Sequence, residues 1–364
     1  MQSLVEVADS PVCRKRRRSF GTLLRVVVAA LHGSLLCAGE RVEVTRQSYH
    51  MGTLCTFTTL ASQREQGLKD LEELTQVVDE TERQLSTWHT ESWISRLNRQ
   101  SPGAVHLDSS SCELLEKLRF WTIETDRAFD PVIGSLIEVW GLHGTGRWPS
   151  EEELQAARQC SGWERLGFIR SSCLVNLQRG ANLDSGAFGK GEALDRVAAR
   201  AGGLGLGSWL VDLGGQAMAG GSPQGREFWT IPLAHPRDRN RPLVTLALKE
   251  GSLATSGGSE RDLKVDRGRI GHILDPRTGY PVENWGAVTV WHTSGLVADI
   301  LSTALYVKRP EQGMRWANRH HVAACFLVVN KDGVEIRKSQ SFAERFSVSA
   351  PKDFRAQVES RPPQ

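Results

Sequence analysis

The sequence lacks the patterns that identify several common classes of protein. None of its seven cysteines stands in a C-x-x-C pair, and their scattered spacing argues against both a zinc site and a disulfide framework. We expect the five cysteines beyond residue 40 to be mostly buried apolar residues. Positive and negative charges nearly balance, at a formal +3, so the composition predicts no broad nucleic-acid-binding face. No strand–G-x-G-x-x-G–helix unit is present, which argues against a general NAD-binding enzyme.

The chain also has little that could cross a membrane. One apolar run extends from Leu23 to Ala38, but it is too short and too often interrupted for a spanning helix. The basic run 14–18 precedes it, and this order is typical of an export signal. Arg17-Arg18-Ser19-Phe20 also fits a twin-arginine pattern loosely. We therefore expect residues 1–40 to be an export signal or N-terminal anchor of a periplasmic protein, exported by a Tat- or Sec-type route.

Beyond the leader, no linker or internal repeat divides the chain. Strand and helix patterns are mixed without regular alternation, which favours the α+β class. We expect one large domain over residues 41–348 and, because prolines and charges dominate the end of the chain, a disordered tail over 349–364.

Local patterns predict the main elements. Apolar residues at three- and four-residue intervals predict helices over 68–85, 114–121, 193–203 and 298–307. Ser150 with Glu153 predicts a capping box, and Gly202-Gly203 a left-handed helix cap. Apolar and β-branched runs predict strands over 54–60, 209–213, 229–233, 244–248 and 288–290, and a closing hairpin over 323–336. Leu253–Arg261 is small and polar, which suits a loop close to a ligand.

The stretch from Leu183 to Asp195 is the one around which the other motifs are arranged. It places glycines and Lys190 directly before a helical pattern. A glycine-rich turn at a helix start leaves backbone N–H groups free to meet phosphate oxygens, and a lysine adds positive charge. The spacing is not that of a Walker loop. Taken alone, the stretch favours a flexible loop before a surface helix.

Three further side chains could carry chemistry. Asp299 and Thr303 stand four residues apart, on one face of a helix, and offer two hard oxygens of the type that magnesium prefers. A helix cap and a packed threonine are the plainer interpretation of that pair. His272 lies in a polar turn, where it is either a general base or a hydrogen-bonded loop residue.

Seven short motifs resemble, in the same order, those of the ApbE family, the FAD:protein FMN transferases. They are Met51-Gly52-Thr53, Phe129-Asp130-Pro131, the stretch 184–190, Asp212-Leu213-Gly214-Gly215, Thr255-Ser256-Gly257, the stretch 272–279, and Ala298-Asp299 through Thr303. Each motif is weak alone, whereas seven in order are a strong signal. The resemblance extends from Met51 to the closing hairpin.

The resemblance implies a function and a set of site residues. The family moves FMN from FAD onto a threonine, sometimes serine, hydroxyl of a partner protein and releases AMP; its single α+β domain would have a ligand cleft between two lobes. FAD, the substrate, would be contacted by Met51, Trp88, Ala128, Phe129, Asp130, Asp184, Lys190 and Ile273, with Trp88 and Phe129 flanking its rings. Mg²⁺ would be held by the Ala187 carbonyl and the Asp299 and Thr303 side chains, with the Ser302 carbonyl as a further candidate. His272 would take the proton of the acceptor hydroxyl.

Two departures from the family pattern concern the FAD contacts rather than the metal site. Ser185 replaces an aliphatic residue, and Ser259 stands where an aromatic residue often precedes Glu-Arg. Two alternatives therefore stay open: a non-catalytic FAD-binding protein that stores or delivers flavin, and an FAD pyrophosphatase that uses water as the acceptor. The leader and the tryptophan content also resemble an exported branch that serves nitrous oxide reductase maturation. Its acceptor is a membrane-bound flavoprotein, so we expect a membrane-bound respiratory subunit as partner.

Overall fold

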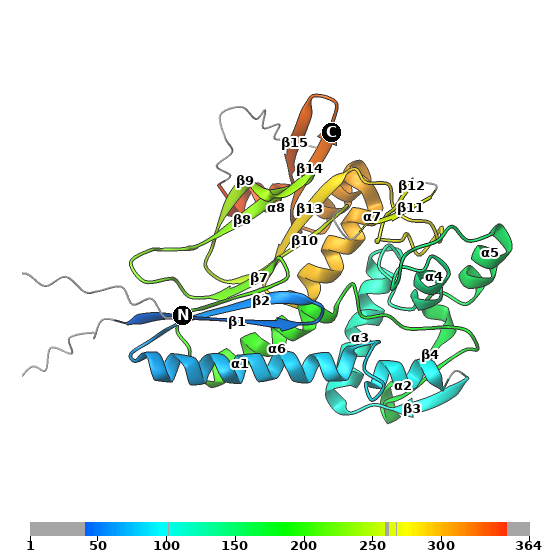
Figure 1. The fold of residues 1–364 in the computed structure, drawn as a ribbon, viewed down its shortest axis with the longest axis horizontal. Helices are drawn as coiled ribbons and strands as arrows, with labels where there is room; N and C mark the ends of the chain where they lie inside the picture. The colour runs from blue at the N-terminus through cyan, green and yellow to red at the C-terminus, as the bar shows by residue number, and fades with distance from the viewer. Residues whose placement is uncertain (1–40, 101, 259–261, 267, 348–364) are drawn as a thin grey trace, which may run out of the picture. The chain divides into compact units, whose positions relative to one another are not determined.

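An eight-stranded antiparallel sheet runs through the structure in the order β1-β2-β6-β7-β10-β13-β14-β15 (Figure 1). The computed structural model describes residues 41–100, 102–258, 262–266 and 268–347. The strands are β1 (Val42–His50), β2 (Thr53–Ala61), β6 (Trp209–Leu213), β7 (Gln216–Gly220), β10 (Gly251–Gly257), β13 (Gly286–His292), β14 (Ala323–Asn330) and β15 (Gly333–Lys338). Because the side chains of a strand alternate between its two faces, neighbours such as Ala287 and Val288 of β13 enter different apolar cores.

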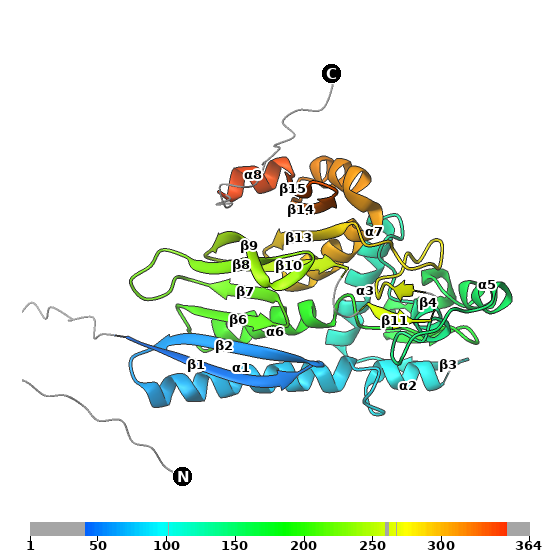
Figure 2. The ribbon, with the colours of Figure 1, turned by 45° about the horizontal axis from the view of Figure 1, so that its top comes forward.

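Three helices cover one face of this sheet, as Figure 2 shows for α1 and α6. They are α1 (Arg64–Leu85), α6 (Gly189–Gly203) and α7 (Gly295–Arg319). The other face is covered by the hairpin of β8 (Trp229–His235) and β9 (Asp238–Leu248), together with α8 (Gln340–Arg345). Helix α7 consists of two helical segments joined at a kink, where Arg309, at φ 61°, precedes Pro310.

A second, largely helical region packs beside the sheet. Its helices are α2 (Trp93–Arg99), α3 (Ser109–Glu124), α4 (Gly134–Val139) and α5 (Glu151–Gln159), with short 3-10 turns at Trp163–Arg165 and Arg170–Ser172. A three-stranded sheet joins β3 (Gly103–His106), β5 (Leu174–Leu177) and β4 (Leu166–Ile169) in that order, and β11 (Leu263–Val265) pairs with β12 (Gly268–Ile270). All described residues belong to one compact unit.

The α+β class predicted from the sequence is confirmed, and so are most elements. The capping box at Ser150 and Glu153 is present, and the closing hairpin pairs as expected. The cap of α6 was predicted two residues too early. Leu206 N–H donates to the Ala201 carbonyl at 2.9 Å and Gly205 N–H to the Gly202 carbonyl at 3.0 Å, a Schellman pair that leaves Gly205 as the left-handed residue.

The prediction of a loop from Leu253 to Arg261 is wrong for its first half. Residues up to Gly257 form β10, which lies between β7 and β13 with α7 packed against it. Ala254 is 1% exposed and Ser252 fully buried. The residues are small because a helix approaches the strand closely, not because the segment is a solvated loop. Ser259 and the rest of that segment lie outside the described residues.

The cysteines differ in part from the expectation of buried, unpaired side chains. Cys55 and Cys325 are free and buried, and Cys160 is free and half-buried. Cys112 and Cys173, however, form a disulfide that joins α3 to the residue before β5. They stand 61 residues apart in sequence, a separation that no local pattern reveals.

The terminal predictions concern residues that the structure does not describe. The expected export signal over 1–40 and the tail over 349–364 both lie there. Within the part of the chain that is described, no helix combines the length and apolar character needed to span a bilayer.

Candidate functional site

A cavity of about 850 Å³ lies between the large sheet, the β8–β9 hairpin and the loops that precede α4 and α6. It is large enough for a small-molecule ligand. The structure brings ten of the predicted site residues to its wall: Ala128, Phe129, Asp130, Asp184, Ala187, Lys190, His272, Ile273, Asp299 and Thr303. These residues come from four separate stretches of the sequence, so their convergence is a result of the tertiary fold.

One end of the cavity is built where the first turns of α6 and α7 meet. The Asp299 carboxylate accepts a hydrogen bond from the Gly191 N–H at 3.0 Å, and the Lys190 Nζ lies 3.7 Å from the same oxygen, Oδ2. Asp299 is 5% exposed. Thr303 follows one turn later, with its Oγ1 3.4 Å from the Ser256 Oγ. The acid is not a helix cap, because Ser294 caps α7.

The close approach of the two helices depends on Gly191. A Cβ atom at this position would lie 2.4 Å from the Gly295 carbonyl oxygen and 2.8 Å from the Asp299 Cβ. Asp195 of α6 reinforces the junction, because its carboxylate accepts from the Leu296 N–H at 3.2 Å and from two more donors at the start of α7. A carboxylate is favourable at a helix N-terminus. The sequence analysis assigned no role to Asp195, although it lies inside the central stretch.

The loop before α6 is fixed by Asp184. Its Oδ1 accepts from the Gly186 N–H at 2.8 Å, and its own N–H donates to the Pro131 carbonyl at 2.8 Å. Its Oδ2 lies 3.4 Å from His143 Nε2, and this hydrogen bond raises the pKa of His143. His143 lines the cavity. The sequence analysis did not identify it, because it is a single histidine in a loop without a recognised motif. Ser185, the departure from the family pattern, does not line the cavity.

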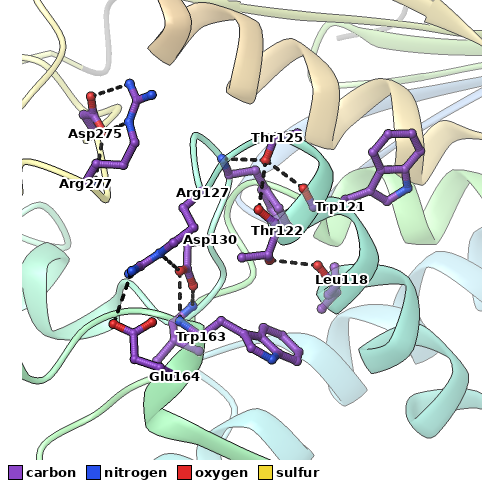
Figure 3. Close-up of polar contacts among 12 residues, drawn as sticks. Leu118, Trp121, Thr122, Thr125, Arg127, Asp130, Trp163, Glu164, Asp275 and Arg277 are labelled. Carbon is purple, nitrogen blue, oxygen red and sulfur yellow. Dashed lines mark hydrogen bonds and ion pairs between the residues drawn. The ribbon is translucent and has the colours of Figure 1, made fainter. Parts of the chain in front are cut away.

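The Asp130 carboxylate holds the neighbouring loop in place (Figure 3). It accepts from the Val132 N–H at 3.0 Å and the Trp163 N–H at 2.9 Å, and the Arg127 Nε lies 3.4 Å away. Burial raises the pKa of Asp130 in spite of these donors. Because donors of the protein already bond to both carboxylate oxygens, the main role of Asp130 is to shape the cavity wall rather than to bind a ligand.

The predicted aromatic contacts are arranged differently from the expectation. Phe129 is 1% exposed and its ring belongs to the main core, so it is not a free stacking surface. Trp88 is 71% exposed, and its ring lies 5.0 Å, centroid to centroid, from that of His143. Neither Trp88 nor Met51 lines the cavity. Met51 is half-buried and packs against the α1–α6 side of the sheet.

Ser302 also lies outside the cavity wall. Its hydroxyl is 2.8 Å from the Ser256 Oγ and donates to the Asp299 carbonyl at 2.9 Å. It is 1% exposed, and these contacts tie α7 to β10 directly beneath the cavity.

His272 is half-buried in the cavity wall, beside a carboxylate that the sequence analysis did not identify. Its Nδ1 lies 3.0 Å from the Asp262 Oδ1, and its backbone N–H donates to the same oxygen at 3.3 Å. On the sheet side, Asp212 and Arg239 complete the wall. Asp212 lies in one of the seven motifs, so the sequence contained a signal for it. No sequence pattern indicated Arg239 or Asp262.

Comparisons with known proteins agree with this geometry. Residues 51–326 match the ApbE family. The chain is 29% identical over 334 residues to the FAD:protein FMN transferase of Vibrio cholerae, covering 88% of this chain and 98% of the relative. With the enzyme of the same name from Treponema pallidum it shares 29% identity over 346 residues, covering 89% and 94%.

Solved structures share the fold. The apo flavinyl transferase ApbE of Pseudomonas stutzeri superposes with a TM-score of 0.75 at 29% identity, covering 84% of this chain and 97% of that one. The ApbE protein of Thermotoga maritima gives a TM-score of 0.77 at 27% identity, covering 84% and 99%.

Proposed function

The chain belongs to the ApbE family, and we propose that it moves FMN from FAD onto a threonine or serine hydroxyl of an acceptor protein, with Mg²⁺ bound, and releases AMP. It is an FAD:protein FMN transferase, the activity named for its relatives in V. cholerae and T. pallidum. FAD and an acceptor protein are its two substrates. The observation that carries the proposed chemistry is the meeting of Lys190, Asp299, Thr303 and His272 in one cavity.

The reaction exchanges one phosphorus–oxygen bond for another. The acceptor hydroxyl oxygen bonds to the FMN phosphorus, the bond from that phosphorus to the bridging oxygen breaks, and AMP leaves with the bridging oxygen. Charge on the phosphoryl oxygens must be neutralised, and the hydroxyl must be held in line. Lys190 supplies a cation whose side chain is only 19% exposed. Because little water screens it, its attraction for phosphoryl oxygens is stronger than that of a solvated lysine. The acceptor is the nucleophile, so no covalent intermediate on this chain is needed.

The residues at the helix junction fit a magnesium ion. The Asp299 carboxylate, the Thr303 hydroxyl and the Ala187 carbonyl are hard oxygen ligands on one cavity wall. The buried Asp299 already faces donors, Lys190 and the Gly191 N–H, as expected of a carboxylate that needs a cation nearby. We propose that these three residues hold the ion, which when bound would neutralise phosphoryl charge.

His272 is the proposed base. It lines the cavity, and a proton-accepting side chain at this place can receive the proton of the acceptor hydroxyl as the new bond forms. It can then return that proton to solvent, because its side chain is 27% exposed.

We also propose export to the periplasm and a membrane-bound respiratory flavoprotein as the acceptor. The basic and apolar leader supports export. The Cys112–Cys173 disulfide is an independent support, because disulfides persist in oxidising compartments such as the periplasm.

Mass spectrometry tests the proposed function directly. A recombinant acceptor fragment that contains the family's threonine motif is incubated with the protein, FAD and Mg²⁺, with a chelator in the control. We expect a metal-dependent gain of one FMN mass on the acceptor and release of AMP. FAD binding without any gain would favour a flavin carrier, and AMP release in the absence of acceptor would favour an FAD pyrophosphatase.

A further inference from the structure

We propose that Asp262 is a positioning residue for the transfer reaction: it holds His272 in the tautomer and orientation in which Nε2 can take the proton of the acceptor hydroxyl. This inference rests on the proposed function, because it concerns the base of that reaction. It adds a residue that no sequence pattern indicated.

The pair is created by a small hairpin. Asp262 directly precedes β11, and His272 follows two residues after β12. Leu263 pairs with Ile270 in the antiparallel register, so the residues on either side of the hairpin's open end are brought together across it. Ten residues of separation in sequence thus become a contact of 3.0 Å between the Asp262 Oδ1 and the His272 Nδ1.

Two bonds to one oxygen fix the histidine. The Asp262 Oδ1 accepts from the His272 backbone N–H at 3.3 Å as well as contacting the ring. The ring and its own backbone are therefore anchored to the same atom, which restricts rotation of the side chain. The Asp262 side chain is only 5% exposed, so little water competes for these bonds.

The contact also selects the tautomer. An ionised carboxylate can only accept hydrogen bonds, so the ring nitrogen that faces it must carry the hydrogen. In neutral His272 the hydrogen is then on Nδ1, and Nε2 has the lone pair that a general base requires. Nε2 has no hydrogen-bond partner among the residues that the structure describes. After proton transfer, the buried carboxylate stabilises the imidazolium ion.

Tyr306 is a further titratable group near Asp262. Burial, followed by the charge of Asp262, raises the pKa of Tyr306, so the phenol stays protonated through the neutral range. A protonated phenol cannot take the proton of the acceptor hydroxyl, so Tyr306 does not compete with His272 as the base.

The test is a double-mutant cycle on the full-length protein, with FAD, Mg²⁺ and the acceptor fragment. We expect Asp262→Asn to slow FMN transfer by about 100-fold and His272→Ala by about 100- to 10,000-fold. Asp262→Asn in the His272→Ala background should cause almost no further loss, since the carboxylate acts through the ring. Asp262→Glu should recover part of the rate. Asp266→Asn, an exposed acid of the same hairpin, is the matched control and should transfer normally.

Two readouts separate positioning from a merely structural role. FAD affinity and the unfolding temperature of Asp262→Asn should stay close to those of the wild type. The loss of rate in Asp262→Asn should appear in kcat, with the KM for FAD nearly unchanged.

The proposal is overturned if Asp262→Asn transfers FMN at the wild-type rate, or if it loses the same factor with and without His272. In either case the wild type still flavinylates the acceptor, so the proposed function survives. Absence of transfer by the wild-type protein would instead overturn both.

Discussion

A buried and an exposed part of the site are built in different ways. At the α6–α7 junction, Asp299 and Lys190 are largely buried, and the backbone of Gly191 is in direct contact with the carboxylate. At the exposed part, here called the rim, Trp88 lies outside the cavity wall and its ring contacts that of His143, an exposed residue of the wall. Chemistry on a pyrophosphate needs donors fixed before the substrate arrives, whereas a rim that admits FAD and an acceptor protein needs access. A series of substitutions tests this difference, and the size of the expected effect decreases from Asp299→Ala to Trp88→Ala.

Asp299→Ala should have the largest effect on activity. It removes the carboxylate at the centre of the proposed metal site, and we expect FMN transfer to fall by at least about 100-fold, because phosphoryl transfer depends on charge neutralisation. Magnesium titration of the transfer rate, followed by mass spectrometry of the acceptor, measures this. Asp332→Ala, which removes an exposed acid between β14 and β15, is the control. Unchanged magnesium-dependent turnover in Asp299→Ala would refute the metal assignment.

Gly191→Ala should damage stability and activity together. The new Cβ would lie 2.4 Å from the Gly295 carbonyl oxygen, so α6 and α7 would have to separate. We expect a loss of about 1–3 kcal/mol in the free energy of unfolding, measured by urea denaturation, and reduced transfer.

Gly202→Ala in the same helix provides the matched control. Nothing lies within 4 Å of its Cβ position, so this change should be neutral or stabilise the fold by about 0.5 kcal/mol. If both variants lost the same free energy of unfolding, the close packing of α6 against α7 would not be the reason that Gly191 is needed.

The His143–Asp184 contact should make a small, pH-dependent contribution to stability. The hydrogen bond that His143 donates to the Asp184 carboxylate raises the pKa of His143 above its ordinary 6.5. The stabilisation is therefore fully present below pH 6.5 and is lost as the pH rises through the folded-state value. His143→Gln should unfold at a lower temperature than the wild type at pH 5.5 and at the same temperature at pH 8.5. The effect should be well under about 1 kcal/mol, because the His143 side chain is about half-exposed and solvent screens the contact.

Trp88→Ala should have the smallest effect of the series. The ring is exposed and lies outside the cavity wall, so we expect FAD affinity to change by less than about threefold, that is under about 0.7 kcal/mol. Fluorescence titration with FAD measures it. A loss of tenfold or more would mean that Trp88 closes over bound FAD, and the rim would then be as much a part of the binding site as the junction.

The same contrast separates what could be predicted from what could not. Asp299 and Thr303 were identified because helical spacing places them on one face, and Lys190 because it stands in a glycine-rich turn; both signals are local. The approach of Lys190 to Asp299 depends on the packing of α6 against α7. Trp88 and Phe129 were assigned as ring contacts, yet one is exposed at the rim and the other is buried in the core. The burial of an aromatic residue depends on what packs around it, and no local pattern records that.

Local patterns in the sequence were enough to establish the α+β class, most helices and strands, the family, and the residue types for phosphate and metal chemistry. These follow from periodicity, turn residues and ordered motifs, which act over a few residues at a time. Tertiary structure alone decided the Asp262–His272 pair, the Cys112–Cys173 disulfide and the burial of β10. Each of these depends on contacts between segments that only the packed chain brings together, and those contacts leave no mark on the spacing of residues within one segment.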